Sequence, residues 1–438
     1  MSSEVPELGI VFWPVGSGDS STIVVTDEVL IQVDLNDRAK ADSDDTPEAP
    51  VVDLLIEALP TVGDRPFLAA FVLTHADQDH CSGFADLLEK ATIGELWATP
   101  RMWRELDGDP DAALCDDAQA FHDEVVRRVD AVKKADSDGD EIALGDRVLV
   151  VGYDVDEEKF DYHDLPSEYL LKPGMSVTKI NGDDHAGRFE AFIHAPFKDD
   201  AAGARNDTSL SLQVTLTDSD SGQEGKILLF GDLAYDTLTK IFEYSESHDR
   251  EQYLEWDLLL APHHCSKKVM YIVEDGSEVL KKDILESFEK HAREGSVIVA
   301  SSATIPTVDK AGDNPPHRKA ADRYKEYADR FICTMEWPSA DDPSPVVFGI
   351  DADGAKIVED NVVELASKNL DLAHLGTDGR RRLSEVAAMA STAGRFATGS
   401  MTSSETAGMT GAERVQAAIK SDRGADVAPT TAVGFGRG

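Results

Sequence analysis

The stretch that decides the fold reads Phe71-Val72-Leu73-Thr74-His75-Ala76-Asp77-Gln78-Asp79-His80. Its first half closes an apolar run, residues 67–73, which is short and rich in aromatic and β-branched side chains and therefore predicts a buried central strand. The strand stops where two histidines and two aspartates begin, so these side chains should lie on the loop at its end, where α/β folds carry their chemistry. Imidazoles and carboxylates together suit zinc, manganese or iron. The alternative is a solvated polar loop with incidental histidines.

Length and composition indicate a protein with a sizeable core. The chain has 438 residues, of which 41% are apolar, enough for one large domain or two ordinary ones. No apolar run approaches the ~18 residues of a membrane span, and the first residues carry no signal-peptide pattern. We therefore expect a cytoplasmic protein that does not enter a membrane. The four cysteines lack CxxC spacing, so neither a disulfide framework nor a cysteine zinc site is indicated.

The charge of the chain is extreme. Acidic residues outnumber basic ones by 84 to 42, giving a formal net charge of −42, and the excess lies before residue 366. A field of this sign repels a polyanion such as DNA, which proteins normally bind through a basic surface. Two explanations stay open: an adaptation of solubility to high salt, which also screens the charge, or a substrate that is small or not a polyanion.

Three later predicted strands are also followed by side chains of types that bind metals. His194 follows residues 188–193, Asp232 follows residues 226–230, and His263 and His264 follow residues 257–261. Each has a simpler reading. A lone histidine at a strand end is usually structural, and Asp232 could instead cap the helix predicted for residues 234–242.

The motif His75-x-Asp77-x-Asp79-His80 resembles the metal-binding signature of the metallo-β-lactamase superfamily, usually His-x-His-x-Asp-His, with Asp77 in place of the second histidine. This variant is similar to the hydrolase domain of the competence protein ComEC and its soluble relatives, and to choline-phosphate esterases. The resemblance spans roughly residues 8–350. It implies an α/β fold of the αβ/βα sandwich type, in which two mixed sheets face each other and helices lie outside.

The same resemblance implies a ligand set for two divalent metal ions, zinc or manganese, because Asp77 makes its site harder than a histidine would. One ion is expected to bind His75, Asp77 and His194, the other Asp79, His80 and His263, and Asp232 is expected to bridge them. His194-Ala195-Pro196 followed by Asn206-x-x-Ser209-Leu210 resembles the third motif of the ComEC type. Pro262-His263-His264-Cys265-Ser266 resembles the family's Pro-His-His-Gly-Ser, with Cys265 where the family has glycine.

Several supporting roles are implied with less direct evidence. Asp34, after a hairpin of residues 22–25 and 29–33, is expected to hold the ligand loop by hydrogen bonds, and Asp19 has a weaker claim; both could be ordinary turn residues. His264 is kept as a neighbour of the site or as the ligand in place of His263. His317, at the start of the helix 318–330, either contacts the substrate or caps locally. The cysteines beside ligands, Cys81 and Cys265, could be ligands, redox-sensitive neighbours or small buried hydrophobes.

The chain divides into an expected hydrolase domain, residues 1–365, and a tail, residues 366–438. Residues 101–145 look like a helical insertion, with a helix predicted for 118–134. The tail is dominated by small and polar residues, so we expect it to be largely disordered and to dock a protein partner.

The function implied is hydrolysis. Two metal ions lower the pKa of a shared water and offset charge on the group under attack, which suits a phosphodiester of nucleic acid or a nucleotide, with Asp79, Asp232 and His317 as catalytic candidates. One alternative is another ester, a lactone, a thioester or an amide. The other is a metal-stabilised interaction module without turnover.

Overall fold

The computed structural model describes residues 6–43, 46–108, 114–152, 160–197, 205–310 and 312–358. The expected disordered, partner-docking tail of residues 366–438 lies outside these ranges. The described residues belong to one compact unit. No helix among them is long and apolar enough to cross a membrane.

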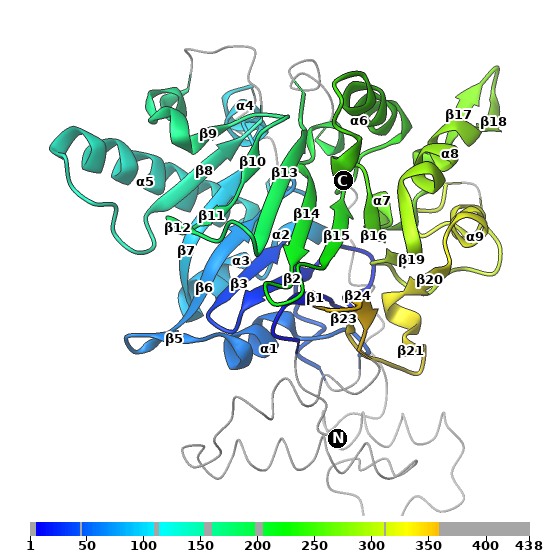
Figure 1. Cartoon of the computed structure of the whole chain (residues 1–438), viewed down its shortest axis with the longest axis horizontal. Helices are drawn as coiled ribbons and strands as arrows, with labels where there is room; N and C mark the ends of the chain where they lie inside the picture. The colour runs from blue at the N-terminus through cyan, green and yellow to red at the C-terminus, as the bar shows by residue number, and fades with distance from the viewer. Residues whose placement is uncertain are drawn as a thin grey trace, which may run out of the picture. The chain divides into compact units, whose positions relative to one another are not determined.

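The first sheet is mixed and contains the strand that precedes the metal motif (Figure 1). Its order is β24 (Gly354–Ile357), β23 (Val346–Asp351), β1 (Gly9–Phe12), β2 (Ser21–Thr26), β3 (Val29–Val33), β6 (Arg65–Val72), β7 (Thr92–Ala98), β8 (Arg147–Val151) and β9 (Leu170–Leu171), with β5 (Thr61–Val62) paired to β6. The strands from β23 to β3 pair antiparallel, and those from β3 to β9 pair parallel. The predicted central strand is therefore confirmed as β6, buried from Phe67 onward.

The second sheet is also mixed. Its order is β10 (Ser176–Val177), β13 (Phe189–Ala195), β14 (Ser211–Thr217), β15 (Glu224–Leu229), β16 (Trp256–Leu260), β19 (Ala292–Ala300) and β20 (Arg330–Cys333). Strands β10 to β15 pair antiparallel, and β15 to β20 pair parallel.

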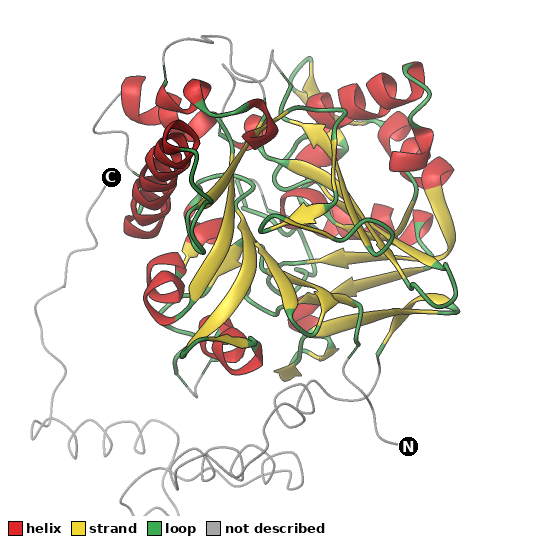
Figure 2. Ribbon diagram, turned by 60° about the vertical axis from the view of Figure 1, so that its left-hand side comes forward, coloured by secondary structure: helices red, strands yellow, loops and turns green. Residues whose placement is uncertain are grey.

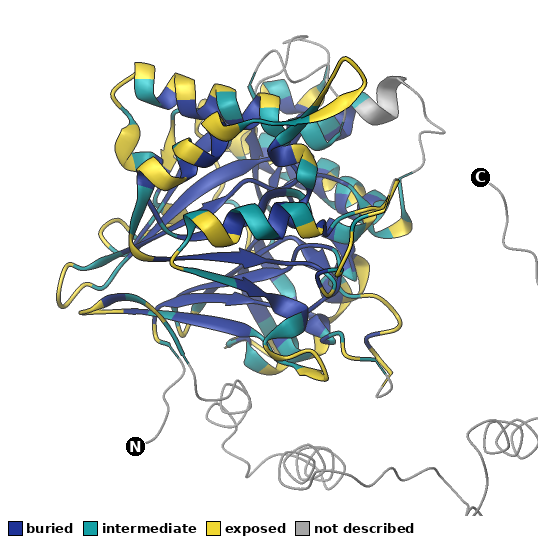
Figure 3. Cartoon of the chain, turned by 90° about the vertical axis from the view of Figure 1, so that its right-hand side faces the viewer, coloured by how far each residue is buried: buried dark blue, intermediate teal, exposed yellow. Residues whose placement is uncertain are grey.

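Alternation along β15 shows how this sheet is packed on both faces. Ile227 and Leu229 belong to the core that also contains Ile10 of β1, whereas Leu228 packs into a second core with the helices outside. Because neighbouring side chains on a strand point to opposite faces, the first core reaches this sheet from the space between the sheets and the second lies behind it. The first core also extends to the helices outside the first sheet, with Leu55, Phe84 and Phe121. Figure 3 shows the strands buried and the helices exposing their outer sides.

Helices cover the outer faces of both sheets (Figure 2). On the first sheet lie α1 (Val51–Ala58), α3 (Phe84–Lys90), α4 (Arg101–Gly108) and α5 (Asp116–Asp138); on the second lie α6 (Tyr235–Ser247), α8 (Lys282–His291) and α9 (Arg318–Tyr327). The architecture is thus the predicted αβ/βα sandwich. The helix predicted for residues 118–134 is α5, and its buried residues Phe121, Val125, Val129 and Val132 repeat at helical spacing.

Candidate metal centre

The candidate ligands converge because each follows a strand whose end reaches the same place. His75 follows β6, and Asp79 and His80 lie in the one-turn helix α2 (Gln78–Cys81). Asp232 follows β15 in the second sheet, and the His263–His264 pair follows β16 in the short turn α7 (Pro262–Cys265). Ligands from both sheets therefore meet across the sandwich.

One buried group consists of Asp19, His80, Asp232 and His264, each of which offers a ligand atom within 4.8 Å of the others. The Nε2 atoms of His80 and His264 lie 3.2 Å apart, and they lie 3.2 and 3.3 Å from Asp232 Oδ1. Two ligands of a tetrahedral zinc ion, bound at about 2.0–2.1 Å, are separated by about 3.3 Å. Asp232 Oδ1 is buried without a hydrogen-bond partner, so this donor set fits a divalent cation.

His80 is oriented by Asp34, as the sequence predicts for a supporting carboxylate. Asp34 Oδ2 lies 2.8 Å from His80 Nδ1 and accepts a hydrogen bond of 2.7 Å from Thr74 Oγ1, while Oδ1 accepts one of 2.7 Å from the Thr74 amide. A donor role for Nδ1 leaves Nε2 as the lone-pair nitrogen that faces Asp232.

His264 is oriented in the same sense from a strained turn. Its Nδ1 lies 3.2 Å from the Ser301 carbonyl and 3.2 Å from Asp19 Oδ1. His263, His264 and Cys265 all have left-handed backbone angles, with φ of 51°, 53° and 64°, and such residues cost about 1–3 kcal/mol each. The turn aims the two imidazoles in different directions, so the structure brings His264, and not the favoured His263, into the group with His80.

His317 is hydrogen-bonded to this turn and to the residues that follow it. Its amide donates to the Cys265 carbonyl over 3.1 Å, its Nδ1 accepts from the Lys267 amide over 3.3 Å, and its Nε2 faces the Asp313 carbonyl at 3.2 Å. Both ring nitrogens therefore have backbone partners. This geometry favours the local positioning role over contact with a substrate.

A second group lies on the other side of Asp232. His75 Nε2 is 3.4 Å from Asp77 Oδ2 and 3.8 Å from Asp232 Oδ2, and His263 Nε2 is 3.6 Å from the same oxygen. His75 Nε2 is buried without a hydrogen-bond partner, whereas its Nδ1 lies 3.1 Å from Thr74 Oγ1. The two oxygens of Asp232 thus face two different pairs of histidines.

The contacts of His194 lie outside both groups. Its Nε2 donates to the Tyr253 carbonyl over 2.9 Å, and its ring packs edge-on against Phe192. Burial lowers its pKa to about 4, so the imidazole is neutral. Within the described part of the chain, no hydrogen bond or ion pair joins it to His75 or Asp232.

The segment after His194 supplies contacts that the sequence reading did not assign. Asn206 Nδ2 donates to Asp232 Oδ2 over 3.0 Å, and Ser209 Oγ lies 3.3 Å from His75 Nδ1. Arg205 Nη1 pairs with Asp77 Oδ1 at 2.6 Å. The Asn-x-x-Ser motif was visible in the sequence, but which ligands it touches depends on how β14 meets the ligand loop.

Electrostatics tie the buried group together. Burial disfavours the charged form of His80, yet Asp232 and Asp34 outweigh it and hold its pKa well above the ordinary value. The pKa of His264 is raised against the same burial penalty by Asp232 and Asp19, and the two imidazoles hold the pKa of Asp232 well below its usual range although burial opposes this. Without a cation the group therefore binds protons, which a divalent ion would displace.

Asp77 and Asp79 are more exposed than Asp232, and we call their side the exposed edge of the centre. The side chains of Asp77 and Asp79 are each 31% exposed, against 4% for Asp232. Burial raises the pKa of Asp77, but His75 and Arg205 bring it down to about 2, so it is ionised at neutral pH. Solvent therefore reaches the centre from the side of Asp77 and Asp79.

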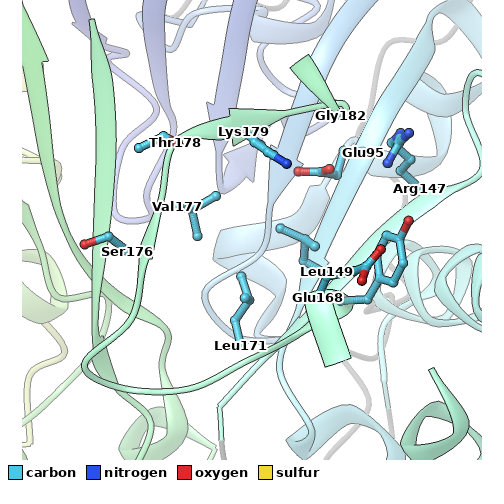
Figure 4. Close-up of a pocket in the computed structure, with 11 residues that line it drawn as sticks. Glu95, Arg147, Leu149, Glu168, Leu171, Ser176, Val177, Thr178, Lys179 and Gly182 are labelled. Carbon is cyan, nitrogen blue, oxygen red and sulfur yellow. The ribbon is translucent and has the colours of Figure 1, made fainter. Parts of the chain in front are cut away.

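A separate cavity of about 570 Å³ lies away from these residues, between β8, β9 and the strands β10 and β11 (Lys179–Ile180). Figure 4 shows Glu95 and Lys179 at one end and Leu149, Leu171 and Val177 along its apolar wall. None of the predicted site residues lines it.

Comparisons with known proteins are distant. No family model matches the chain, and no curated protein matches it. Among solved structures it is similar to unliganded yeast PDE1, at 11% identity over 74% of this chain and 97% of that one, with a TM-score of 0.35. It is also similar to a metallo-beta-lactamase superfamily protein from Sulfolobus tokodaii, at 13% identity over 64% and 95%, with a TM-score of 0.26. Similarities this distant carry no argument about activity, so fold and site stand on their own geometry.

Proposed function

We propose that this chain is a metal-dependent hydrolase of the metallo-β-lactamase superfamily that holds two divalent cations and cleaves a phosphodiester. The observation that carries the proposal is the placement of Asp232, whose two oxygens face the His80–His264 pair and the His75–His263 pair. A likeness to ComEC-type hydrolases stays a prediction from the motif.

The proposed ligand sets follow this geometry. One cation would be held by His80, His264 and Asp79, whose Oδ2 lies 3.5 Å from His264 Nε2, and the other by His75, Asp77 and His263, with Asp232 shared between them. Asp19 faces the opposite ring nitrogen of His264 and would orient that ring, or bind the first cation directly. His194, predicted as a ligand, is not needed in this arrangement. Each set combines two imidazoles with carboxylates, so zinc fits its nitrogen ligands and manganese its oxygen ligands.

The cations would supply Lewis acidity and a water of lowered pKa. The chain's own residues do the positioning. Asp34 fixes the His80 ring. Asn206 donates to the Asp232 carboxylate, and Ser209 Oγ contacts His75 Nδ1 and accepts from the Asp232 amide, so these two residues position Asp232 and His75. Burial raises the pKa of Asp79, but His264 and His80 outweigh it and hold the pKa below its usual range, so the partly exposed carboxylate is ionised and can accept a hydrogen bond from a water.

Arg205 supports an anionic substrate. It is the guanidinium that pairs with Asp77 at the exposed edge of the centre, and its side chain is 24% exposed. Its fork of donors matches the oxygens of a phosphoryl group. The net charge of −42 opposes a long polyanion, so a nucleotide-sized phosphodiester is favoured over duplex DNA. The same charge keeps a neutral ester, lactone, thioester or amide as the second candidate.

The test begins with metal content and turnover. Full-length protein loaded with zinc or manganese should hold two ions per chain and hydrolyse a chromogenic phosphodiester such as bis-p-nitrophenyl phosphate. Asp232→Asn should remove both properties, and Asp236→Asn, a matched change in the first turn of α6, should remove neither. Two bound ions without phosphodiester turnover would contradict the proposed substrate and favour a carboxylic ester or an amide. Absence of bound metal would refute the proposed metal-dependent hydrolase.

A further inference from the structure

Two thiols face each other beside the metal-ligand loop. Cys81 Sγ and Cys115 Sγ lie 3.5 Å apart, although the residues are 34 positions apart in the chain. Cys81 directly follows His80 and is fully buried, whereas Cys115 is partly exposed and is the N-cap of α5. Two sulfurs at this separation need to approach by only about 1.5 Å to reach the ~2.05 Å of a disulfide.

Neighbouring contacts hold the two thiols in this arrangement. Asp117, in the first turn of α5, accepts hydrogen bonds of 3.0 Å from the Gly83 amide and 2.9 Å from the Ala85 amide. Cys81 Sγ also donates to the Asp77 carbonyl over 3.3 Å. The start of α5 is therefore docked onto the segment that follows the ligand motif, and the pair is aligned before any bond forms.

The remaining cysteines offer a contrast. Cys265 and Cys333 are buried, and Cys333 Sγ contacts Ser302 Oγ at 3.5 Å. Among the described residues, the one pair of thiols within hydrogen-bond distance of each other is Cys81–Cys115. Partial exposure also makes Cys115 the thiol that a soluble oxidant reaches first.

We propose that Cys81 and Cys115 are a modification site at which a peroxide-class oxidant forms a reversible disulfide that fastens α5 to the metal-ligand loop. The Cys115 thiolate attacks the peroxide, and two electrons pass from sulfur to oxygen, giving a sulfenic acid and hydroxide. Cys81 then attacks that sulfur, an S–S bond forms, and water leaves with the Cys81 proton. A dithiol reductant restores both thiols by exchange.

The position of Cys115 assists the first step. An N-cap lies at the positive end of the 23-residue α5, where a negative charge is stabilised. The disulfide would close a loop through the insertion, which restricts the unfolded chain and should raise the thermal midpoint of the oxidised protein. This inference concerns thiol chemistry and does not rest on the proposed hydrolase activity.

The test treats the full-length protein as purified with hydrogen peroxide, then alkylates, digests and maps it by mass spectrometry. We expect the free thiols to fall from four to two, a cross-linked Cys81–Cys115 peptide that dithiothreitol cleaves, and a higher thermal midpoint before reduction. Four surviving thiols, or a sulfinic acid on Cys115 beside a reduced Cys81, would overturn the proposal.

Two variants make the result specific. Cys115→Ser places a favoured N-cap residue at the start of α5, so the helix should be retained. Peroxide should then leave the Cys81 thiol free for alkylation. Cys333→Ala leaves the pair intact and should still form the bond. If Cys81 is oxidised equally in Cys115→Ser, the two thiols do not react with each other and the proposal fails.

Discussion

Asp34 orients the imidazole of His80, a candidate metal ligand, without being a ligand itself. It faces His80 Nδ1 at 2.8 Å and also anchors Thr74 through two hydrogen bonds. A carboxylate in this position sets the tautomer of the imidazole and increases its basicity as a ligand. The effect of Asp34 on metal binding should therefore exceed its effect on the fold.

Asp34→Asn should test this role. The amide keeps an acceptor for Thr74 but presents a donor to His80, so we expect metal affinity to fall about 10–100-fold. A titration of metal against a chromophoric chelator measures it. Asp53→Asn, which removes only a surface pair with Lys90, is the control, and equal affinities in the two variants would contradict the assignment.

Glu95 is a second residue whose surroundings set its behaviour. It is 3% exposed on β7, and Trp97 Nε1 donates to its Oε1 over 2.7 Å. Burial, opposed by the Trp97 hydrogen bond and by Arg147, raises its pKa from 4.5 to about 7. Because the folded pKa is above the unfolded one, its contribution to stability is fully present below pH 4.5 and is lost as pH rises through about 7.

Glu95→Gln should remove this pH dependence. The wild-type free energy of unfolding should decline by up to about 3 kcal/mol between pH 4.5 and 8 from this group, and the variant should lack that decline. Urea unfolding at a series of pH values measures the difference. Glu168→Gln, an exposed neighbour on the same cavity, should leave the wild-type profile unchanged; a profile identical in all three proteins would refute the prediction.

At the scale of elements, α5 behaves as an integral part of the sandwich although the sequence marks its region as an insertion. Arg128 is buried inside it and donates to the carbonyls of Ile93, Gly94 and Arg147 over 2.9, 3.3 and 3.0 Å, and to Glu124 over 2.8 Å. These bonds satisfy the backbone where β7 and β8 begin, so the helix and the sheet edge depend on each other.

Arg128→Met should destabilise the chain by about 3–5 kcal/mol, because it leaves three buried carbonyls without their donor, while Glu124 keeps Arg127 as its partner. Arg127→Met is the matched control, since Arg127 is 49% exposed and pairs at the surface with Glu124 and Asp146. Thermal unfolding distinguishes the two, and losses of equal size would show that Arg128 does not tie α5 to the sheet.

At the scale of the whole molecule, self-repulsion is the dominant electrostatic feature. A net charge of −42 on 438 residues destabilises any compact state. Salt shortens the Debye length from about 10 Å at 0.1 M to about 3 Å at 1 M and so reduces this repulsion.

The thermal midpoint should therefore rise between about 0.1 and 1 M potassium chloride. Tetramethylammonium chloride at equal ionic strength should raise it by a similar amount if general screening is the cause. Differential scanning calorimetry on the full-length protein in each salt measures the thermal midpoint. A midpoint that is flat or falls with salt would exclude self-repulsion as a limit on stability.

The sequence by itself determined the strands and the places where ligands gather, and the resemblance of the His75–His80 motif to a known superfamily implied the sandwich. Apolar runs such as residues 67–73 specify strands, and a strand's end carries whatever side chains follow it, so His75 and Asp232 could be located from spacing alone. Local information of this kind suffices when neighbours in the chain are neighbours in space.

Only the tertiary structure decided which nitrogen and which oxygen face each other. His263 and His264 are adjacent in sequence and equivalent in chemistry, and the left-handed turn that contains them is bound by the amide of His317, from a distant part of the chain. Likewise, Asp77 meets Arg205 and Cys81 meets Cys115 because distant segments pack together. Such pairings arise from the free energy of the whole fold, and no local pattern in the chain encodes them.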